Sequence, residues 1–192
     1  MNLLAHAILS PANPGVRVGN VVADFVKGRV RKTLPGDVQA GIELHRRIDA
    51  FTDLHPIVLG CATMLEERWG RYATVLVDIF FDHCLTAAWG SYADGRREDF
   101  VVQVYGDLRA YRACLPERAQ LAVTVMMGDD WLNAYAQLDG LRLALTRLSR
   151  RLRHGIELAP AVDDFAARQV EFDAAFAAFF PQLVDHVGAA RQ

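Results

Sequence analysis

The sequence predicts an all-α fold, a single compact multi-helix domain over residues 1–192. Hydrophobic residues make up 52% of the chain, which is enough for a substantial core. The strict alternation of apolar and polar residues that marks a half-buried strand is almost absent, and apolar residues recur at helical spacing instead. Proline and glycine divide the chain into segments of helical length, without a repeat, a linker or a low-complexity tract.

Each expected helix fills the interval between two successive breaks. The breaks lie at residues 11–15, 28, 34–36, 55–56, 69–70, 90, 115–116, 128, 140, 155 and 159–160. Pro56 suits the first turn of a helix, with Asp53 or His55 as its cap, and Pro181 is expected to break the last helix. In chain order, the expected helices span residues 2–9, 16–27, 37–51, 56–68, 71–88, 96–112, 116–127, 131–137, 140–153 and 161–186.

Charge and hydropathy predict a soluble, cytoplasmic protein. A net charge of -2 and an isoelectric point of about 6.3 do not suggest general binding to nucleic acid or to an anionic membrane. The longest apolar stretch, residues 72–89, contains Asp78, Asp82 and His83, which a membrane span would rarely tolerate. The N-terminus has no basic leader and soon reaches His6, so no signal peptide is expected.

The three cysteines are Cys61, Cys84 and Cys114, and they form no CxxC motif. They lie within apolar stretches, so we expect buried free thiols in a reducing compartment.

Histidine and aspartate gather in the first half of the chain. Neutral imidazole together with carboxylate suits Mn, Fe, Mg or Zn rather than a soft metal. Four of the six histidines lie there, namely His6, His45, His55 and His83, and they are accompanied by Asp24, Asp49, Asp53, Asp78 and Asp82.

Spacing brings some of these residues onto shared helix faces. His45 and Asp49 are four residues apart, as are Asp78 and Asp82, and His83 follows about 100° further round the helix. Residues 72–95 contain no lysine or arginine, and a helix that is apolar all round is expected to be buried. Buried carboxylates need a cation, which a divalent metal or an arginine from another helix could supply. Two carboxylates with an adjacent histidine favour the metal.

Asp24 and His6 pose the same question, since each lies in an otherwise apolar segment, with Asn20 one turn before Asp24. A lone histidine on an apolar helix is often a core residue bonded to a carbonyl, and a lone aspartate is often paired with arginine. The case for a metal site rests on four helices that each offer a histidine or an aspartate.

The neighbours of His45 and Asp49 suggest a phosphate substrate. Arg46 and Arg47 could bind phosphate oxygens in bidentate fashion, although Arg46 could equally pair with Asp49. HExxH, a paired ExxH, GxSxG and Walker A motifs are absent from the sequence. Metal-activated water is therefore the most economical chemistry.

Four blocks of the sequence resemble the bacterial acyl carrier protein phosphodiesterase family, also called acyl carrier protein hydrolase. They are MNLLAHAILS, GNVVADFVKG, GIELHRRIDAFTDLHP and DIFFDHCL, and they cover most of residues 1–90. The resemblance implies a helical fold like that of the HD phosphohydrolases and a divalent metal, Mn²⁺ with Mg²⁺ or Fe²⁺ as alternatives. It also implies a reaction in which the 4'-phosphopantetheine arm is removed from a serine of holo acyl carrier protein.

The HD motif itself does not transfer, because its His-Asp doublet is missing and Asp82-His83 stands in reversed order. The family blocks give the expected roles instead. Metal ligands are expected among His6, Asp24, His45, Asp82 and His83. The groups that orient water or neutralise the phosphate are expected among Asp49, Asp78, Arg46 and Arg47. Asn20, Asp53 and His55 are expected to support the site by contacts with these groups and with the metal ligands. For Asp53 a helix cap, and for His55 an exposed turn, are the alternatives.

An acidic carrier protein implies a basic docking surface. The candidates are Lys27, Arg29, Arg31 and Lys32, or the arginine-rich residues 142–154, and each could instead be an ordinary solvated face. Two other functions remain open from the residues alone. One is a hydrolase of a nucleotide or another small phosphate ester, and the other is a non-catalytic helical binding protein.

Overall fold

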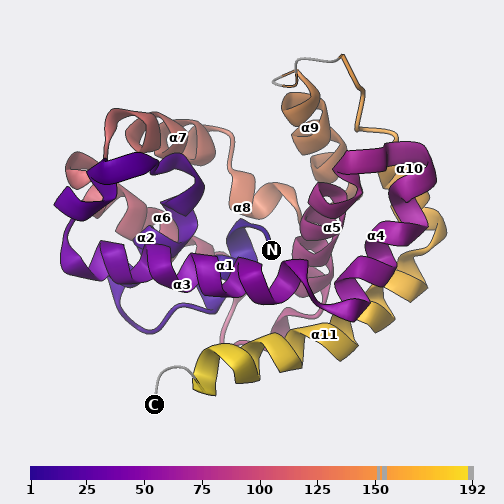
Figure 1. Cartoon of the computed structure of the whole chain (residues 1–192), viewed down its shortest axis with the longest axis horizontal. Helices are drawn as coiled ribbons and strands as arrows, with labels where there is room; N and C mark the ends of the chain where they lie inside the picture. Colours follow the sequence, from indigo (N-terminus) through magenta and orange to yellow (C-terminus); the bar gives the residue numbers. More distant parts are fainter. Residues whose placement is uncertain (151, 153–154, 190–192) are drawn as a thin grey trace.

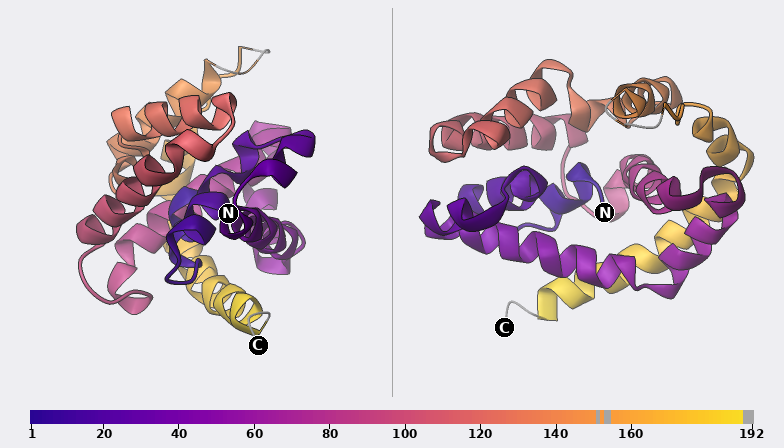
Figure 2. Two further views of the ribbon diagram at one scale, coloured as in Figure 1. Left: turned by 90° about the vertical axis from the view of Figure 1, so that its left-hand side faces the viewer. Right: turned by 45° about the horizontal axis from the view of Figure 1, so that its top comes forward.

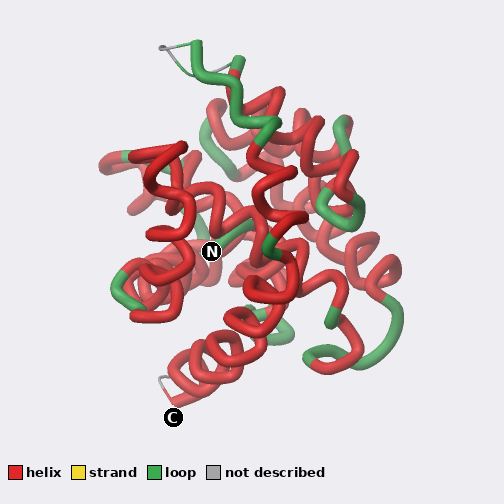
Figure 3. The backbone as a smooth tube through the Cα atoms, turned by 90° about the vertical axis from the view of Figure 1, so that its right-hand side faces the viewer, coloured by secondary structure: helices red, strands yellow, loops and turns green. Residues whose placement is uncertain are grey.

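Helices form all the regular secondary structure in the described part of the chain. A computed structural model describes residues 1–150, 152 and 155–189, and no strand occurs among them (Figure 3). The predicted all-α class is confirmed, while the likeness to HD phosphohydrolases stays a prediction. The elements are α1 (Leu3–Ile8), α2 (Pro14–Val22), η1 (Ala23–Phe25), η2 (Gly28–Thr33), α3 (Gly36–Asp53), α4 (Pro56–Trp69), η3 (Gly70–Tyr72), α5 (Ala73–Ala87), η4 (Trp89–Ser91), α6 (Arg97–Tyr111), η5 (Arg112–Cys114), α7 (Glu117–Gly128), α8 (Trp131–Ala134), α9 (Leu138–Ser149), α10 (Ala161–Ala167) and α11 (Gln169–Ala189).

The second helix differs from its predicted range of 16–27. It begins at Pro14, because the side chain of Asn13 accepts a hydrogen bond from the Val16 N–H at 3.0 Å and caps the first turn. It ends at Val22, and the chain continues as two short 3-10 segments on either side of residue 27. Asp24 therefore lies in a tight turn rather than on a helix face.

The predicted break at Pro181 is wrong, because this proline lies inside α11. The chain breaks instead at Arg168, whose backbone leaves helical geometry with φ -123° and ψ 20°. This earlier break lets two aromatic rings pack round Phe80. The ring centroids of Phe165 and Phe172 lie 4.6 Å and 5.6 Å from that of Phe80.

Helix α1 lies inside the molecule, and the other helices surround it. In Figure 1 the N-terminus is seen near the centre, with α2 and α3 on one side and α4, α5 and α11 on the other. The right-hand view of Figure 2 shows the N-terminus between a layer that contains α2 and α3 and a layer that contains α7 and α9. Helix α5 has buried side chains on almost every side, as its apolar sequence predicts.

Helices α2 and α3 pack with their backbones in contact. A Cβ atom added to Gly41 would lie 2.1 Å from the carbonyl oxygen of Val16, and one added to Gly19 would lie 2.1 Å from that of Val38. Only glycine permits this approach at both positions. It brings α3 close enough for His45 to reach the backbone of Asn20.

The cysteine prediction is partly wrong. Cys61 and Cys84 are buried and unpaired, as expected, but Cys114 is exposed. It lies in the surface turn η5, where its sulfur contacts the carbonyl oxygen of Tyr111 at 3.0 Å.

Within the described residues, no single helix is long and apolar enough to cross a membrane. One bent pair, Gly36–Asp53 with Pro56–Ala87, meets the criteria of length and composition together, with an angle of 65° between its parts.

Candidate metal centre

The buried amide of Asn20 orients two histidine rings. Its Nδ2 donates to the carbonyl oxygen of His6 at 2.6 Å and to the hydroxyl of Ser10 at 3.0 Å. Its Oδ1 therefore accepts from Nδ1 of His6 at 2.9 Å, while its backbone oxygen accepts from Nδ1 of His45 at 2.7 Å. In its neutral form each ring therefore carries its proton on Nδ1 and presents an unprotonated Nε2.

The two Nε2 atoms meet the carboxylate of Asp49. The rings stack with centroids 4.0 Å apart and planes at 18°. Nε2 of His6 lies 3.2 Å from one carboxylate oxygen, and Nε2 of His45 lies 2.9 Å from the other. One ligand atom from each residue lies within 4.8 Å of the others, so the group could hold a metal ion. We call His6, His45 and Asp49 the His–His–Asp cluster.

The surroundings of both Nε2 atoms fit a divalent cation. Nε2 of His45 is buried, and it faces carboxylate oxygens of Asp49 at 2.9 Å and of Asp24 at 3.5 Å. Nε2 of His6 faces the carbonyl oxygen of Met1 and the carboxylate of Asp49, each at 3.2 Å. Lone pairs that face oxygen atoms are satisfied by a cation, and Nδ1–H bonded to an oxygen is the usual support of a metal-ligating histidine. The donor set of imidazole and carboxylate suits a first-row divalent metal.

All three side chains of the cluster have strongly shifted pKa values. Burial, together with the nearby His45, lowers the pKa of His6 to about 4. Burial opposes charge on His45 too, but hydrogen bonds to Asp24 and Asp49 outweigh it and raise the pKa of His45 to about 9. Burial also opposes the charge of Asp49, yet His45 and His6 hold the pKa of Asp49 well below its usual range. A metal would compete with the proton on His45.

Asp78 is a further carboxylate next to the cluster. Its Oδ1 lies 3.0 Å from the Met1 amino group, which also lies 3.5 Å from Asp49. Burial raises the pKa of Asp78, and the amino group only partly offsets this. Burial lowers the pKa of the amino group, but the charges of Asp78 and Asp49 outweigh that effect and raise it. The Met1 amino group therefore contacts both the carboxylate of the cluster and that of Asp78.

Asp82 binds backbone instead of joining the cluster. Its two oxygens accept the N–H groups of Leu4 and Ala5 at 2.9 and 3.1 Å, and its side chain is fully buried. Burial outweighs these bonds and raises the pKa of Asp82 to about 7. The carboxylate anchors the first turn of α1, which carries His6. The structure therefore gives Asp82 a positioning contact where the sequence suggested a metal ligand.

His83 also lies outside the cluster. One residue further round α5, its Nδ1 lies 2.8 Å from the carbonyl oxygen of Tyr135, and its ring meets that of Phe165 edge-on at 5.4 Å. His83 is thus a core histidine bonded to a carbonyl, which is the alternative that the sequence left open for His6.

The remaining predicted residues of the third block have other partners or are exposed. The Arg46 guanidinium pairs with Glu43 at 3.2 Å rather than with Asp49, and Arg47 is exposed. His55 accepts from the Ile57 N–H at 3.3 Å and caps α4. Asp53 is exposed at the end of α3. Arg46 and Arg47 follow His45 on α3 at steps of about 100° round the helix and so turn away from its face.

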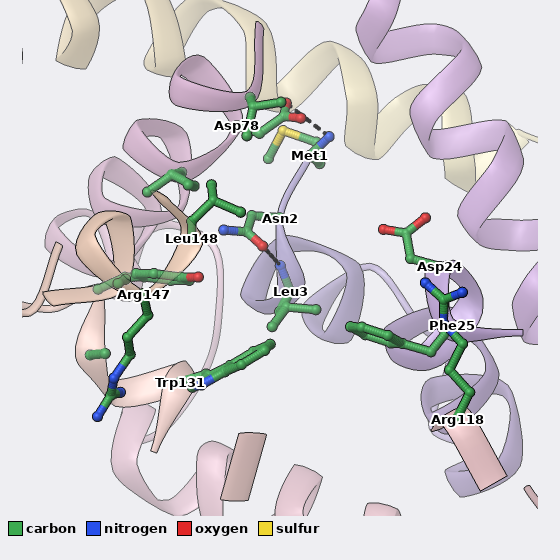
Figure 4. A pocket seen from close by; sticks show the side chains of 15 residues that line it. Met1, Asn2, Leu3, Asp24, Phe25, Asp78, Arg118, Trp131, Arg147 and Leu148 are labelled. Atoms are coloured by element: carbon green, nitrogen blue, oxygen red, sulfur yellow. Dashed lines mark hydrogen bonds and ion pairs between the residues drawn. The ribbon is translucent and has the colours of Figure 1, made fainter. Parts of the chain in front are cut away.

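A cavity of about 400 Å³ adjoins the cluster (Figure 4). Asp24, whose carboxylate lies 3.5 Å from Nε2 of His45, and Asp78 belong to its wall. The rest of the wall is mostly apolar, and much of it comes from α5, α7, α8 and α9. No sequence signal pointed to the residues of α7 and α8. The lining residues are Met1, Asn2, Leu3, Asp24, Phe25, Val75, Asp78, Ile79, Arg118, Trp131, Ala134, Tyr135, Ala144, Arg147 and Leu148.

The fold and the cluster define an all-helical protein with a candidate divalent-metal centre beside a largely apolar cavity. The chain belongs to the acyl carrier protein phosphodiesterase family, whose sequence profile matches residues 1–183. The match extends well beyond the four blocks of the first 90 residues and includes the helices that wall the cavity.

Relatives with this name span almost the whole chain. The acyl carrier protein phosphodiesterase of Photorhabdus laumondii is 30% identical over 186 residues, which are 96% of this chain and 94% of the relative. Those of Pectobacterium atrosepticum and Escherichia coli O157:H7 are each 28% identical over 185 residues, 96% of both chains. No solved structure gives a significant match to the chain.

Replacing Asn20 by alanine should weaken metal binding. The variant removes the acceptor that holds the ring of His6, and loss of such a supporting bond typically lowers metal affinity about 10- to 100-fold. Chelator competition with Mn²⁺ measures the change, with circular dichroism as the check on folding. Asn133→Ala removes an amide outside the cluster and the cavity and should bind metal as the wild type does. Equal affinities for the Asn20 variant and the wild type would contradict the assignment.

Asp82→Asn should change how stability depends on pH. The pKa of Asp82 is about 7 in the folded protein, whereas the ordinary pKa of a free aspartate side chain is 3.8. Between these values the folded state binds more protons than the unfolded state, so Asp82 destabilises the wild type as the pH rises. The free energy of unfolding of the variant minus that of the wild type should increase by up to about 1.4 kcal/mol per pH unit over this interval. Urea unfolding across the interval tests this, and a difference that does not change with pH would refute it.

Proposed function

We propose that this protein hydrolyses the phosphodiester between 4'-phosphopantetheine and a serine of holo acyl carrier protein, giving apo carrier and free 4'-phosphopantetheine. The observation that carries the proposal is the His–His–Asp cluster beside a cavity, in a chain whose family profile spans residues 1–183. The names of its relatives support the substrate.

His6, His45 and Asp49 would hold the metal through two Nε2 atoms and a carboxylate oxygen, with Asp24 next to His45. We propose Mn²⁺, with Mg²⁺ or Fe²⁺ as alternatives. When bound, such a cation polarises a phosphoryl oxygen and makes a water more acidic. We therefore propose Asp49 as a metal ligand, whereas the sequence suggested that it orients the attacking water.

Two further aspartates have separate roles, one on the water and one on the position of His6. Asp78 lies beside the cluster and on the cavity wall, so it orients the attacking water and accepts its proton. Its raised pKa makes it a stronger base than an ordinary aspartate. Asp82 anchors the turn that carries His6 and so holds that ring against Asn20.

His45→Ala and Asp49→Asn should abolish turnover and metal binding together. Each removes one of three candidate ligands, so the conversion of holo to apo carrier should fall by more than about 100-fold. Mass spectrometry of the carrier measures the conversion, and elemental analysis measures the bound metal. Glu67→Gln, an exposed change on α4, is the matched control and should change neither.

Two results would count against this function. One is a folded His45 or Asp49 variant that binds metal and turns over normally. The other is a wild type that cleaves small phosphate diesters but leaves holo carrier intact, which would favour the small-ester hydrolase.

The carrier should dock on the basic segment of residues 27–32, which we call the basic turn. It follows directly on Asp24, and Lys27, Arg29 and Lys32 are exposed. Arg31 is partly buried and pairs with Glu43 at 2.9 Å. The alternative surface is weaker where it is described, because Arg142 pairs with Asp163 and Arg147 pairs with Asp129. The rest of that stretch includes residues 151, 153 and 154, which lie outside the described residues.

Salt should therefore weaken recognition of the carrier. Exposed charges act mainly on association, so KM for holo carrier should rise several-fold from about 0.05 to about 0.3 M salt while kcat changes little. The double variant Lys27→Glu/Arg29→Glu should raise KM at low salt and flatten this dependence. Arg109→Glu, an equally exposed reversal on α6, is the control. Docking on the basic turn would be disproved if KM changed neither with salt concentration nor in the double variant.

A further inference from the structure

We propose that Arg118 binds the phosphate of the 4'-phosphopantetheine arm and that the chain of the arm lies along the apolar wall of the cavity. This inference rests on the proposed function and adds a residue and a surface to it. Arg118 lies outside the four sequence blocks on which the family resemblance was based, and so do Val75, Trp131, Ala144 and Leu148 of the wall.

The phosphate needs a cation that the predicted arginines do not supply. Asp24, Asp49 and Asp78 lie in or beside the cluster, so a phosphodiester anion that enters this space meets three carboxylates. Arg46 is exposed and paired with Glu43, and Arg47 does not line the cavity. A further cation on the cavity wall would offset the repulsion and orient the phosphate.

Arg118, on the first turn of α7, meets this need. It lines the cavity, and its side chain is exposed. In Figure 4 its guanidinium group extends toward Phe25 and Asp24. Asp24 leads to the cluster, because its carboxylate lies 3.5 Å from Nε2 of His45. Within the described part of the chain, no carboxylate lies within ion-pair distance of it. An arginine without an acidic partner keeps its fork of donors available for two phosphate oxygens.

Arg147, the other arginine of the cavity, differs on each point. Its guanidinium pairs with Asp129 at 3.2 Å. In Figure 4 its side chain extends away from Asp24 and Met1. The geometry therefore favours Arg118 as the phosphate contact.

The rest of the cavity suits a neutral chain. Apolar and aromatic side chains such as Val75, Ile79, Trp131, Ala144 and Leu148 line it. Its volume of about 400 Å³ lies within the range of small-molecule sites. The pantetheine part of the arm is uncharged and carries methyl and methylene groups beside two amides. An arm bound this way has its phosphate next to Asp24 and the cluster, and its chain directed toward α5 and α9.

Calorimetric binding of two small probes to the full chain tests the inference. The probes are 4'-phosphopantetheine and pantetheine, which lacks the phosphate. Arg118→Ala should weaken binding of 4'-phosphopantetheine about tenfold or more and leave pantetheine unchanged, and Arg118→Lys should fall between alanine and the wild type. Arg109→Ala, an exposed arginine outside the cavity, should match the wild type with both probes. Ala144→Phe narrows the wall and should weaken both probes alike.

Unchanged pantetheine binding also shows that the Arg118 variants are folded. The inference is overturned if Arg118→Ala binds 4'-phosphopantetheine as the wild type does, if it loses both probes equally, or if the wild type binds neither. A wild type that binds 4'-phosphopantetheine through Arg118 but leaves holo carrier uncleaved would keep the binding site and overturn the proposed function. The two failures are therefore distinguishable.

Discussion

The hydrogen bonds of Asn20 are the constraint on which the site depends. One buried residue fixes the ring of His6 with its side chain and the ring of His45 with its backbone carbonyl. This works only because Gly19 and Gly41 let α2 and α3 touch, so that a side chain on α3 reaches the backbone of α2. Asp82 completes the arrangement from α5, since it holds the N-terminal turn of α1 that carries His6. Three helices and one turn thus fix the direction of two nitrogen lone pairs.

The electrostatics of the cluster then favours a cation at this point. Two imidazole nitrogens and several carboxylate oxygens face one another in a partly buried space. Burial lowers the pKa of His6 to about 4, so that ring stays neutral at pH 7 and leaves its lone pair toward oxygen atoms. His45, with a pKa of about 9, holds a proton that a metal could replace. The adjoining cavity changes from acidic to apolar within a short distance, which suits a substrate with an anionic end and a neutral chain.

The sequence predicted the fold class well because helical spacing and breaker residues are local signals. It failed where distant packing decides, as at Arg168 and Pro181, where the aromatic contacts of Phe80 set the position of the break. The pairing of His45 with Asp49 was predictable because both lie on one helix face. The different hydrogen-bond partners of Asp82 and His83 were not predictable, because they depend on which backbone groups of α1 and of the end of α8 lie against α5. Arg118 carries no local signal at all, since only the packing of α7 against the turn after α2 brings it to the cavity.

The most direct test of the account is the position of a metal in crystals of the protein grown with Mn²⁺ and measured for anomalous scattering. The account predicts one strong anomalous peak within coordination distance of Nε2 of His6, Nε2 of His45 and a carboxylate oxygen of Asp49. The Nδ1 atoms of both rings should remain bonded to Asn20. A peak held by Asp82 and His83 instead, or no peak near the stacked rings in crystals that turn over substrate, would contradict it.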